Sequence, residues 1–206
     1  MIEGILEKRI CPVVVLDHVE DAEPLADALL EGGLNVMEIT FRTDAAADCI
    51  QKIANDRPEI IVGAGTLLCP EQVQRAKDSG ATFGLAPGLN PQVLAKANEL
   101  ELPFCPGVMT PTDIEEALGL GCDLLKFFPA GPAGGPKFLK ALAGPYAHTG
   151  VKFIPTGGIN RANMREYLDL SVVGAIGGSW MVDSVLVKEK RWAEITWLTR
   201  EALAAV

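Results

Sequence analysis

The stretch VMEITFRTDAAADCIQKIANDRPEIIVGAG, residues 36–65, predicts the fold of the whole chain because its pattern recurs along the sequence. It contains two short apolar runs, 36–41 and 60–65, separated by a segment that mixes polar and apolar residues with a helical period. Eight runs of this kind follow one another, at residues 11–16, 36–41, 60–65, 83–88, 103–108, 124–129, 152–158 and 173–178. Their starts are 20 to 28 residues apart, about the length of a strand plus a crossover helix in compact α/β proteins.

The runs are nearly continuous in apolar character, which is typical of parallel strands buried on both faces. Between them, residues 20–31 and 70–79 have the pattern of amphipathic helices, and each is followed by glycine. Asn90, Thr110 and Asn160 are predicted to cap the starts of three further helices. Eight strand–helix units predict an α/β protein with a single (β/α)8 barrel domain over residues 1–206. An open, doubly wound sheet is the alternative.

Composition excludes several classes of protein. The 206 residues are 49% hydrophobic and 22% charged, as in globular proteins rather than disordered ones. The net charge of −9 does not suit a surface for nucleic acid or anionic membrane. No apolar run approaches the roughly 18 residues of a membrane helix, and residues 1–9 do not resemble a signal peptide. We therefore expect a cytoplasmic protein.

The cysteines and histidines give no sign of a cofactor. The five cysteines, Cys11, Cys49, Cys69, Cys105 and Cys122, are scattered without a C-x-x-C pair, and we expect reduced and mostly buried thiols. The two histidines lie far apart in the sequence, whereas catalytic zinc sites usually draw on two or three His ligands. No metal and no cofactor are expected.

Lys126 is the only charged residue in the run LLKFFP, residues 124–129. A barrel strand has no solvated face, so this ammonium group must be paired or must lose its proton. Desolvation lowers the pKa of a lysine, and the neutral amine is a nucleophile that forms imines with carbonyl compounds. The other interpretation is a buried ion pair without chemistry.

Glu38 repeats this pattern in the run VMEITF. Strand side chains alternate between faces, so Glu38, Thr40 and Arg42 share one side. We expect this side to face the barrel interior and to rise toward the mouth. There Glu38 can exchange protons with a substrate and Arg42 can bind a carboxylate. A plain Glu38–Lys126 salt bridge is the alternative, but it leaves the Arg42 cation without an anion.

Several predicted strands end in glycine or proline, and in a barrel these ends all meet at the catalytic mouth. Thr66 closes the third run with a hydroxyl group. Gly157-Gly158 and Gly177-Gly178-Ser179 close the last two runs, where barrels of this fold commonly bind phosphate. Tight turning alone is the other explanation for these glycines. No G-x-G-x-x-G motif is present, and residues 131–137 do not form a Walker loop.

Six segments, taken in order, resemble the bacterial 2-keto-3-deoxy-6-phosphogluconate (KDPG) aldolases, also called the 4-hydroxy-2-oxoglutarate aldolase family. They are EITFRT at 38–43, VGAGT at 62–66, APG at 86–88, KFFPA at 126–130, PTGGI at 155–159 and GGSW at 177–180. The resemblance runs essentially end to end. It implies a class I aldolase, a lyase on a TIM barrel that forms a Schiff base and releases pyruvate. Family members act in the Entner–Doudoroff pathway and are usually homotrimers.

The resemblance also implies the role of each site residue. Lys126 is the Schiff-base lysine and Glu38 the general acid and base. The residues implied to bind substrate are Arg42 and Thr66 (carboxylate), Pro87 and Phe128 (pyruvyl pocket), Gly157, Gly158 and Ser179 (phosphate), with Thr156 and Gly178 in the same motifs. Residues 131–136 and Asp17-His18 match no family pattern, which leaves the breadth of substrates open.

Several other functions stay open at the level of the residues. The same imine chemistry suits 4-hydroxy-2-oxoglutarate, which gives pyruvate and glyoxylate, or the phosphogalactonate epimer of the substrate. A phosphosugar isomerase or epimerase needs only Glu38 as its base, with Lys126 paired to it. A phosphate-binding module without catalysis does not account for a buried lysine, glutamate and arginine together.

Overall fold

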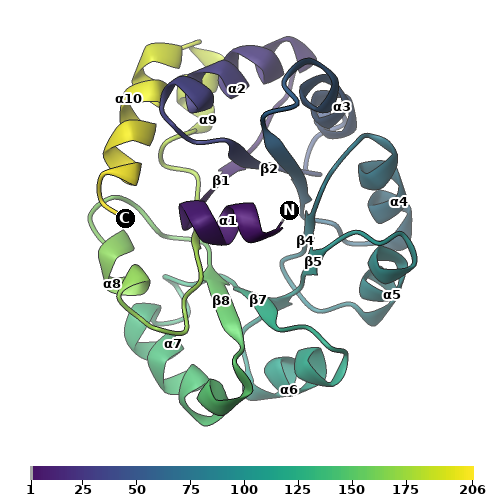
Figure 1. Cartoon of the computed structure of the whole chain (residues 1–206), viewed down its shortest axis with the longest axis vertical. Helices are drawn as coiled ribbons and strands as arrows, with labels where there is room; N and C mark the ends of the chain where they lie inside the picture. Colours follow the sequence, from purple (N-terminus) through teal and green to yellow (C-terminus); the bar gives the residue numbers. More distant parts are fainter. Residues whose placement is uncertain (1) are drawn as a thin grey trace.

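The structure, a computed structural model, describes residues 2–206, with side chains from Gly4 onward. Nine short parallel strands lie at the centre: β1 (Ile10–Val14), β2 (Val36–Thr40), β3 (Ile61–Gly65), β4 (Gly84–Leu85), β5 (Phe104–Cys105), β6 (Gly107–Val108), β7 (Leu124–Phe127), β8 (Lys152–Pro155) and β9 (Ile176–Gly178). Figure 1 shows them curling around a common axis with helices outside.

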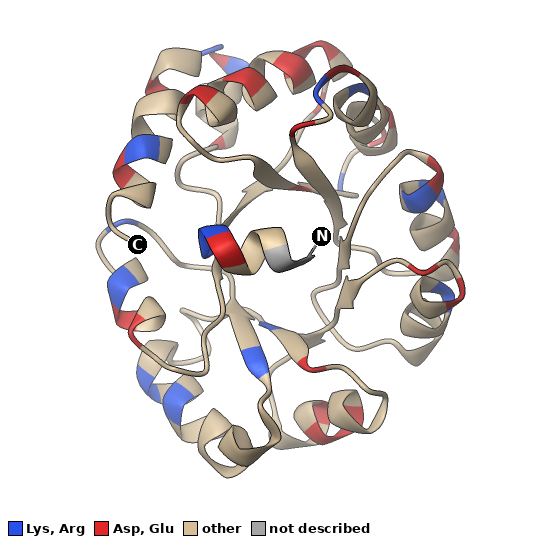
Figure 2. Ribbon diagram, viewed as in Figure 1, with Lys and Arg blue, Asp and Glu red and all other residues tan. Residues whose placement is uncertain are grey.

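The outer helices are α2 (Ala22–Glu31), α3 (Ala46–Asp56), α4 (Pro70–Asp78), α5 (Pro91–Glu99), α6 (Pro111–Gly119), α7 (Gly135–Ala143), α8 (Met164–Leu168), α9 (Ser184–Lys188) and α10 (Trp192–Leu203). Two 3-10 turns, η1 (Val19–Asp21) and η2 (Gly144–Thr149), precede α2 and follow α7. Charged residues lie mainly on these helices and their loops (Figure 2). No helix within residues 2–206 is long and apolar enough to cross a membrane.

Strand order supports the barrel and rules out the doubly wound sheet. Strands pair in the order β5-β4-β3-β2-β1-β9 and, in a second sheet, β6-β7-β8. β1 therefore pairs with both β2 and β9, which brings the first and last strands together. The single bridges Phe153↔Val173 and Thr156↔Gly177 connect β8 with the β9 segment. The resulting architecture is a (β/α)8 barrel-like fold.

The fifth predicted strand, 103–108, is wrong as one continuous element because Pro106 divides it into β5 and β6. Proline has no N–H to donate to a neighbouring strand. Its carbonyl oxygen still accepts a hydrogen bond of 2.8 Å from Lys126 N. The break therefore leaves β7, which carries Lys126, attached to its neighbour.

The predicted helix start at Asn160 is also wrong. The Asn160 side chain accepts a hydrogen bond from Ala162 N at 2.9 Å, and Asn163 Oδ1 accepts one from Asn160 N at 2.8 Å. These local bonds hold turns, so α8 begins only at Met164. The starts at Asn90 and Thr110 are confirmed, since each side chain accepts a hydrogen bond from the first turn of its helix.

One end of the barrel is closed by α1 (Ile2–Lys8), which lies across the centre of the ring in Figure 1. Ile5 on this helix is fully buried. A Cβ at Gly4 would overlap the side chain of Ile61, the first residue of β3, so α1 covers the amino-terminal ends of the strands. The opposite, carboxyl-terminal end is left as the mouth, where barrel enzymes place their active sites.

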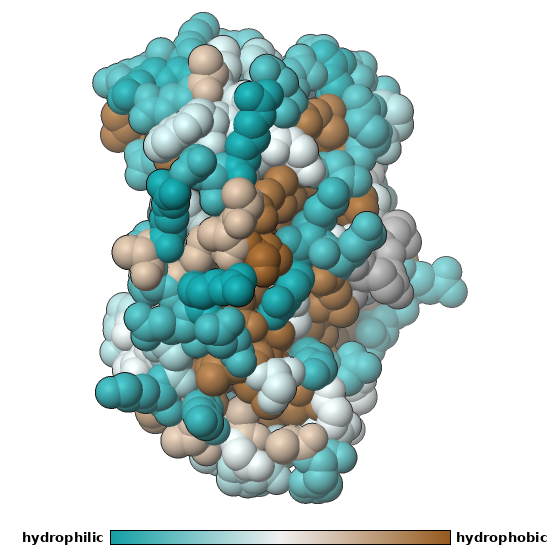
Figure 3. Space-filling model, turned by 60° about the vertical axis from the view of Figure 1, so that its left-hand side comes forward, coloured by the Kyte–Doolittle hydropathy of each residue, from teal (hydrophilic) through white to brown (hydrophobic). Residues whose placement is uncertain are grey.

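The outer surface is mostly polar but not uniformly so. On the side seen in Figure 3, hydrophilic residues cover the helices and an apolar band runs between them. Elsewhere a small cavity of about 330 Å³ is lined by Met109, Thr110, Pro129, Pro132, Ala133 and Phe138. Met109 and Phe138 are both exposed.

Candidate active site

Lys126 and Glu38 meet inside the barrel. Lys126 lies in β7 and Glu38 in β2, and Lys126 Nζ donates a hydrogen bond of 3.0 Å to Glu38 Oε1. Lys126 is 5% exposed and Glu38 is 1% exposed. Two opposite charges at this depth compensate each other, and loss of either partner would leave a buried charge without one. The structure thus brings together the two residues predicted to carry the chemistry.

A glycine on the neighbouring strand makes room for the carboxylate. Thr40 of β2 is opposite Gly65 of β3, two residues beyond Glu38. A Cβ at Gly65 would overlap Glu38 Oε1. Gly63, two residues earlier in β3, leaves room for a different side chain, because a Cβ there would overlap the ring of Phe83. Thr40, predicted to share the side of Glu38, donates its hydroxyl hydrogen to Val14 O at 2.9 Å.

Above the pair, a cavity of about 500 Å³ opens at the mouth. The predicted residues that line it are Arg42, Phe128, Thr156, Gly157, Gly158, Gly178 and Ser179. Lys126 and Glu38 do not line it themselves, since both are buried below. Lys126 Nζ nevertheless lies 5.9 Å from the centre of the Phe128 ring. The amine is therefore next to a side chain of the cavity wall.

Arg42 supplies a cation at this mouth. Its side chain is exposed and also lines a second cavity of about 520 Å³ on the other side. Among residues 4–206, no carboxylate lies within ion-pair distance of its guanidinium group, which leaves the group available to an incoming anion. The sequence-based expectation of a second cation without an internal anion therefore holds for the described residues.

The turns after β8 and β9 offer backbone donors to the same cavity. Gly157 and Gly158 adopt φ angles of 95° and 78°, which favour glycine. Their carbonyl oxygens are occupied, by Gly131 N at 2.8 Å and by Asn163 Nδ2 at 2.9 Å. The parallel bridge Thr156↔Gly177 directs Gly157 N–H toward Gly177 O, whereas among the described residues the N–H groups of Gly158 and Ser179 donate no hydrogen bond. Free N–H groups in such turns are suited to bind an anion.

Two of the predicted residues lie outside this cavity. Pro87 lines an adjacent cavity of about 330 Å³, which shares Phe128 with the first. Thr66 lines neither, but its backbone has a φ of 59°, in the left-handed region that a β-branched residue rarely adopts. Strain of this kind costs about 1–3 kcal/mol and is concentrated at functional sites.

The three fully buried thiols, two of them near the Lys126–Glu38 pair, are not reactive groups. Burial raises the pKa of Cys11 well above its usual value, and the charge of Glu38 adds to this effect. Burial likewise raises the pKa of Cys105, with Lys126 opposing it, and raises that of Cys49 to about 12. All three therefore stay protonated near neutral pH. Cys69 and Cys122 are half-buried, and the described chain contains no disulfide.

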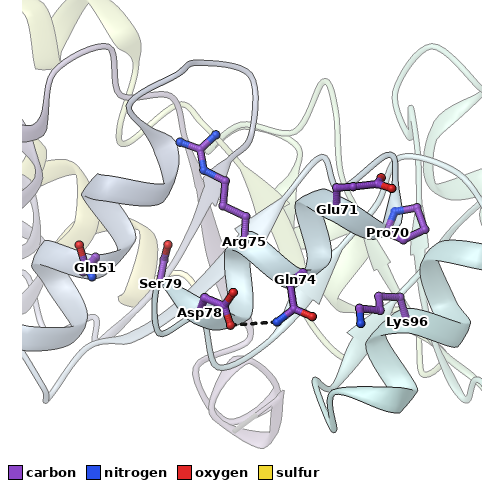
Figure 4. Close-up of a pocket in the computed structure, with 8 residues that line it drawn as sticks. All are labelled: Gln51, Pro70, Glu71, Gln74, Arg75, Asp78, Ser79 and Lys96. Carbon is purple, nitrogen blue, oxygen red and sulfur yellow. Dashed lines mark hydrogen bonds between the residues drawn. The ribbon is translucent and has the colours of Figure 1, made fainter.

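A larger cavity, about 640 Å³, lies on the outside of the barrel between α3, α4 and α5 (Figure 4). Its walls carry Gln51, Pro70, Glu71, Gln74, Arg75, Asp78, Ser79 and Lys96. Gln74 and Asp78 bond to each other within α4 at 2.9 Å. No predicted site residue lies here. Within residues 4–206, no cluster of three or more His, Cys, Asp or Glu side chains has the geometry of a metal site.

Comparison with known proteins agrees with this geometry. The family model for KDPG and KHG aldolases matches residues 1–198. The 2-dehydro-3-deoxy-phosphogluconate aldolase of Haemophilus influenzae is 47% identical over 203 residues, which is 98% of this chain and 95% of its own length. The chain belongs to the KDPG and KHG aldolase family. These aldolases are lyases, and the predicted family is thus confirmed.

Two further relatives are similar to this aldolase over nearly its whole length. The KHG/KDPG aldolase of Escherichia coli is 44% identical, with 94% of this chain and 90% of the relative covered. A crystal structure of KDPG aldolase from Legionella pneumophila, with pyruvate captured at low pH as a covalent carbinolamine intermediate, is 40% identical. It superposes with a TM-score of 0.91 over 96% of both chains.

Sequence reasoning missed part of the aldolase cavity. Val13 and Val15 of the first strand segment line its wall, and so do Asp17, Asp183 and Lys188. Alternation along the first run could have found the two valines, because they share a face with Cys11. Asp17 and Lys188 are 171 positions apart, and neither interrupts an apolar run. Only the fold brings them together.

Proposed function

We propose that this chain is a Schiff-base (class I) aldolase that cleaves 2-dehydro-3-deoxy-6-phosphogluconate into pyruvate and D-glyceraldehyde 3-phosphate. The buried Lys126–Glu38 pair, with its 3.0 Å contact, carries this proposal. The pair brings an amine and a carboxylate into contact under an open cavity, which is the arrangement that a nucleophile and a proton carrier require. The proposed pathway is the Entner–Doudoroff route, and the proposed location is the cytoplasm, which suits five cysteines without a disulfide.

Lys126 provides the electron sink. Breaking the C3–C4 bond of a 2-keto acid leaves an electron pair on C3, and a ketone accepts it poorly at neutral pH. The amine of Lys126 adds to the C2 carbonyl to give a carbinolamine, which loses water to form a protonated imine. When C3–C4 breaks, its electron pair flows toward the imine and an enamine results.

Glu38 moves the protons. While Lys126 adds to the carbonyl, the carboxylate transfers protons as the carbinolamine forms and loses water. It then takes the proton of the C4 hydroxyl, directly or through a water molecule, as glyceraldehyde 3-phosphate leaves. The enamine is protonated at C3, and hydrolysis of the new imine releases pyruvate and restores the Lys126 amine. A general base in this position contributes about 10²–10⁴-fold to the rate.

We assign the two ends of the substrate to two groups of residues at the mouth. Arg42 and Thr66 are proposed to hold the carboxylate, and Pro87 and Phe128 to pack against the pyruvyl carbons. The free N–H groups of the glycine turns, with Ser179, are proposed to hold the phosphate. Thr156, which is buried at the cavity wall, and Gly178 complete the proposed substrate-binding set.

We also propose that the chain forms a homotrimer. Exposed apolar side chains, among them Met109, Leu120 and Phe138, support an interface between copies because they would be shielded there. Light scattering after size-exclusion chromatography should give three times the 21.9 kDa mass of the chain. A monomer mass at micromolar concentration would contradict this assembly.

Release of pyruvate from a panel of substrates tests the proposed activity. We expect the wild-type chain to cleave 2-dehydro-3-deoxy-6-phosphogluconate, Lys126→Ala to be inactive, and Glu38→Gln to be slower by about 10²–10⁴-fold. Circular dichroism shows whether each variant is folded, since both remove one partner of a buried ion pair. Rapid turnover by folded Lys126→Ala would refute the proposal.

The same panel separates the alternatives. The free N–H groups at the glycine turns favour a phosphorylated substrate over 4-hydroxy-2-oxoglutarate. Faster cleavage of 4-hydroxy-2-oxoglutarate, or of the galactonate epimer, would shift the proposal to that substrate and leave the imine chemistry intact. Interconversion of phosphosugars without release of pyruvate would indicate an isomerase or epimerase instead.

A further inference from the structure

We propose that Lys188, at the end of α9, is a specificity-determining residue that binds the substrate phosphate by exchanging its partner Asp17 for it. The inference rests on the proposed function, because it concerns the phosphate of that substrate. It assigns a side-chain cation to a subsite for which the family resemblance names only glycines and a serine.

Lys188 lines the cavity in which we propose that the phosphate binds. It lines the 500 Å³ cavity together with Gly158 and Ser179, whose N–H groups donate no hydrogen bond among the described residues. Arg42 lines this cavity too, but it also faces the 520 Å³ cavity on its other side, where Lys188 does not reach. Asp17, the ion-pair partner of Lys188, lines both cavities, so Arg42 and Lys188 are two cations of the same mouth. We assign Lys188 to the phosphate because it shares only the cavity of the glycine turns.

The present partner of Lys188 holds it loosely. Lys188 Nζ lies 3.4 Å from Asp17 Oδ2, and both side chains are exposed. A strong bond between an ammonium group and a carboxylate is shorter, about 2.7–2.9 Å, and exposed pairs of this kind add little to stability. The ion pair with Asp17 therefore keeps Lys188 near the cavity, and breaking it costs little free energy.

A phosphate is the stronger partner for this lysine. It carries roughly two negative charges at neutral pH and three acceptor oxygens, against a single charge on Asp17. The other carboxylate of this wall, Asp183, already accepts a hydrogen bond of 2.9 Å from Val185 N as the cap of α9. Lys188 is therefore a cation of this cavity that is available to an incoming phosphate.

Steady-state kinetics of Lys188→Gln test this inference. For the phosphorylated substrate we expect KM to rise about tenfold, the loss of one hydrogen bond to a charged group, with kcat within twofold of wild type. For 2-dehydro-3-deoxygluconate, which lacks the phosphate, kcat/KM should not change. Lys140→Gln on α7 is the matched control, because it removes the same charge from an exposed lysine outside every cavity described above.

Asp17→Asn separates phosphate binding from a merely structural role. If Lys188 binds phosphate, removing the competing carboxylate should leave KM equal to or below that of wild type. An equal rise of KM in Asp17→Asn and Lys188→Gln would show that the ion pair only supports the loop, and would overturn the inference. So would an unchanged KM in Lys188→Gln while the wild type cleaves the substrate. A wild-type chain that releases no pyruvate would refute the proposed function itself.

Discussion

Glu38 depends on a residue that has no side chain. Gly65 leaves the space that the Glu38 carboxylate fills, and a methyl group there would overlap Oε1. Position 65 is therefore a positioning site for the proposed acid and base. It acts without touching a reacting atom.

Gly65→Ala should consequently slow turnover although every functional group is retained. We expect kcat to fall by up to the 10²–10⁴-fold contribution of a general base, because the carboxylate must move away from Lys126. Gly119→Ala is the control, since a Cβ there meets nothing within 4 Å. Steady-state rates of pyruvate release give the comparison. A Gly65→Ala enzyme as fast as the control would show that the carboxylate has room to relax.

The two buried residues of the site could be predicted from the sequence, whereas the residues at the rim of the cavity could not. Lys126 and Glu38 are conspicuous because a charge within an apolar strand demands a partner. Asp17 and Lys188 are ordinary surface residues in sequence, and their pairing depends on how the β1 and β9 loops meet at the mouth. Thr66 could be singled out by its motif, but its strained backbone could not.

Among the helices, α6 shows how local sequence positions an element near the mouth. Thr110 and Asp113 form a capping box, in which Asp113 Oδ2 accepts hydrogen bonds of 2.9 Å from Met109 N and Thr110 N. Partial burial raises the pKa of Asp113, but these bonds outweigh it and the net pKa lies below the usual value.

Asp113→Ala should destabilise the fold by about 1 kcal/mol at pH 7, the usual value of a helix cap. A carboxyl group whose pKa is lowered in the folded state stabilises above its unfolded pKa, and this contribution disappears as pH falls through the folded value. The difference between wild type and variant should therefore shrink below about pH 4. Urea denaturation at pH 7 and pH 3 measures it. If wild type and variant differed in free energy of unfolding as much at pH 3 as at pH 7, the charge of Asp113 would not be the source of the stabilisation.

Element boundaries were harder to predict than element order. The even spacing of the apolar runs predicted the alternation of strands and helices, since both depend on periodicity that is visible in the sequence. Pro106 splits a strand and Asn160 starts a turn instead of a helix, because in both places local hydrogen bonding overrides the pattern. The end of the barrel that α1 covers could not be predicted either, because the residues that α1 contacts lie in strands far from it in the sequence.

The whole molecule is organised around one core, and we propose that residues 1–206 fold as a single domain. Phe83 is fully buried and packs over Gly63 inside the barrel. Phe83→Ala should lower the free energy of unfolding by about 3–5 kcal/mol, as loss of a buried aromatic ring does. Trp197→Ala, at a more exposed position on α10, is the control and should cost much less. Thermal unfolding should remain one cooperative transition, whereas two separate transitions would contradict a single domain.

The proposed aldolase mechanism depends on covalent attachment of the substrate at Lys126. The most direct measurement is mass spectrometry of the chain after reduction with borohydride in the presence of pyruvate. We predict one added pyruvyl group, located by peptide sequencing to Lys126 and missing when pyruvate or borohydride is omitted. An adduct on another lysine, or no adduct from a chain that still releases pyruvate, would contradict the account.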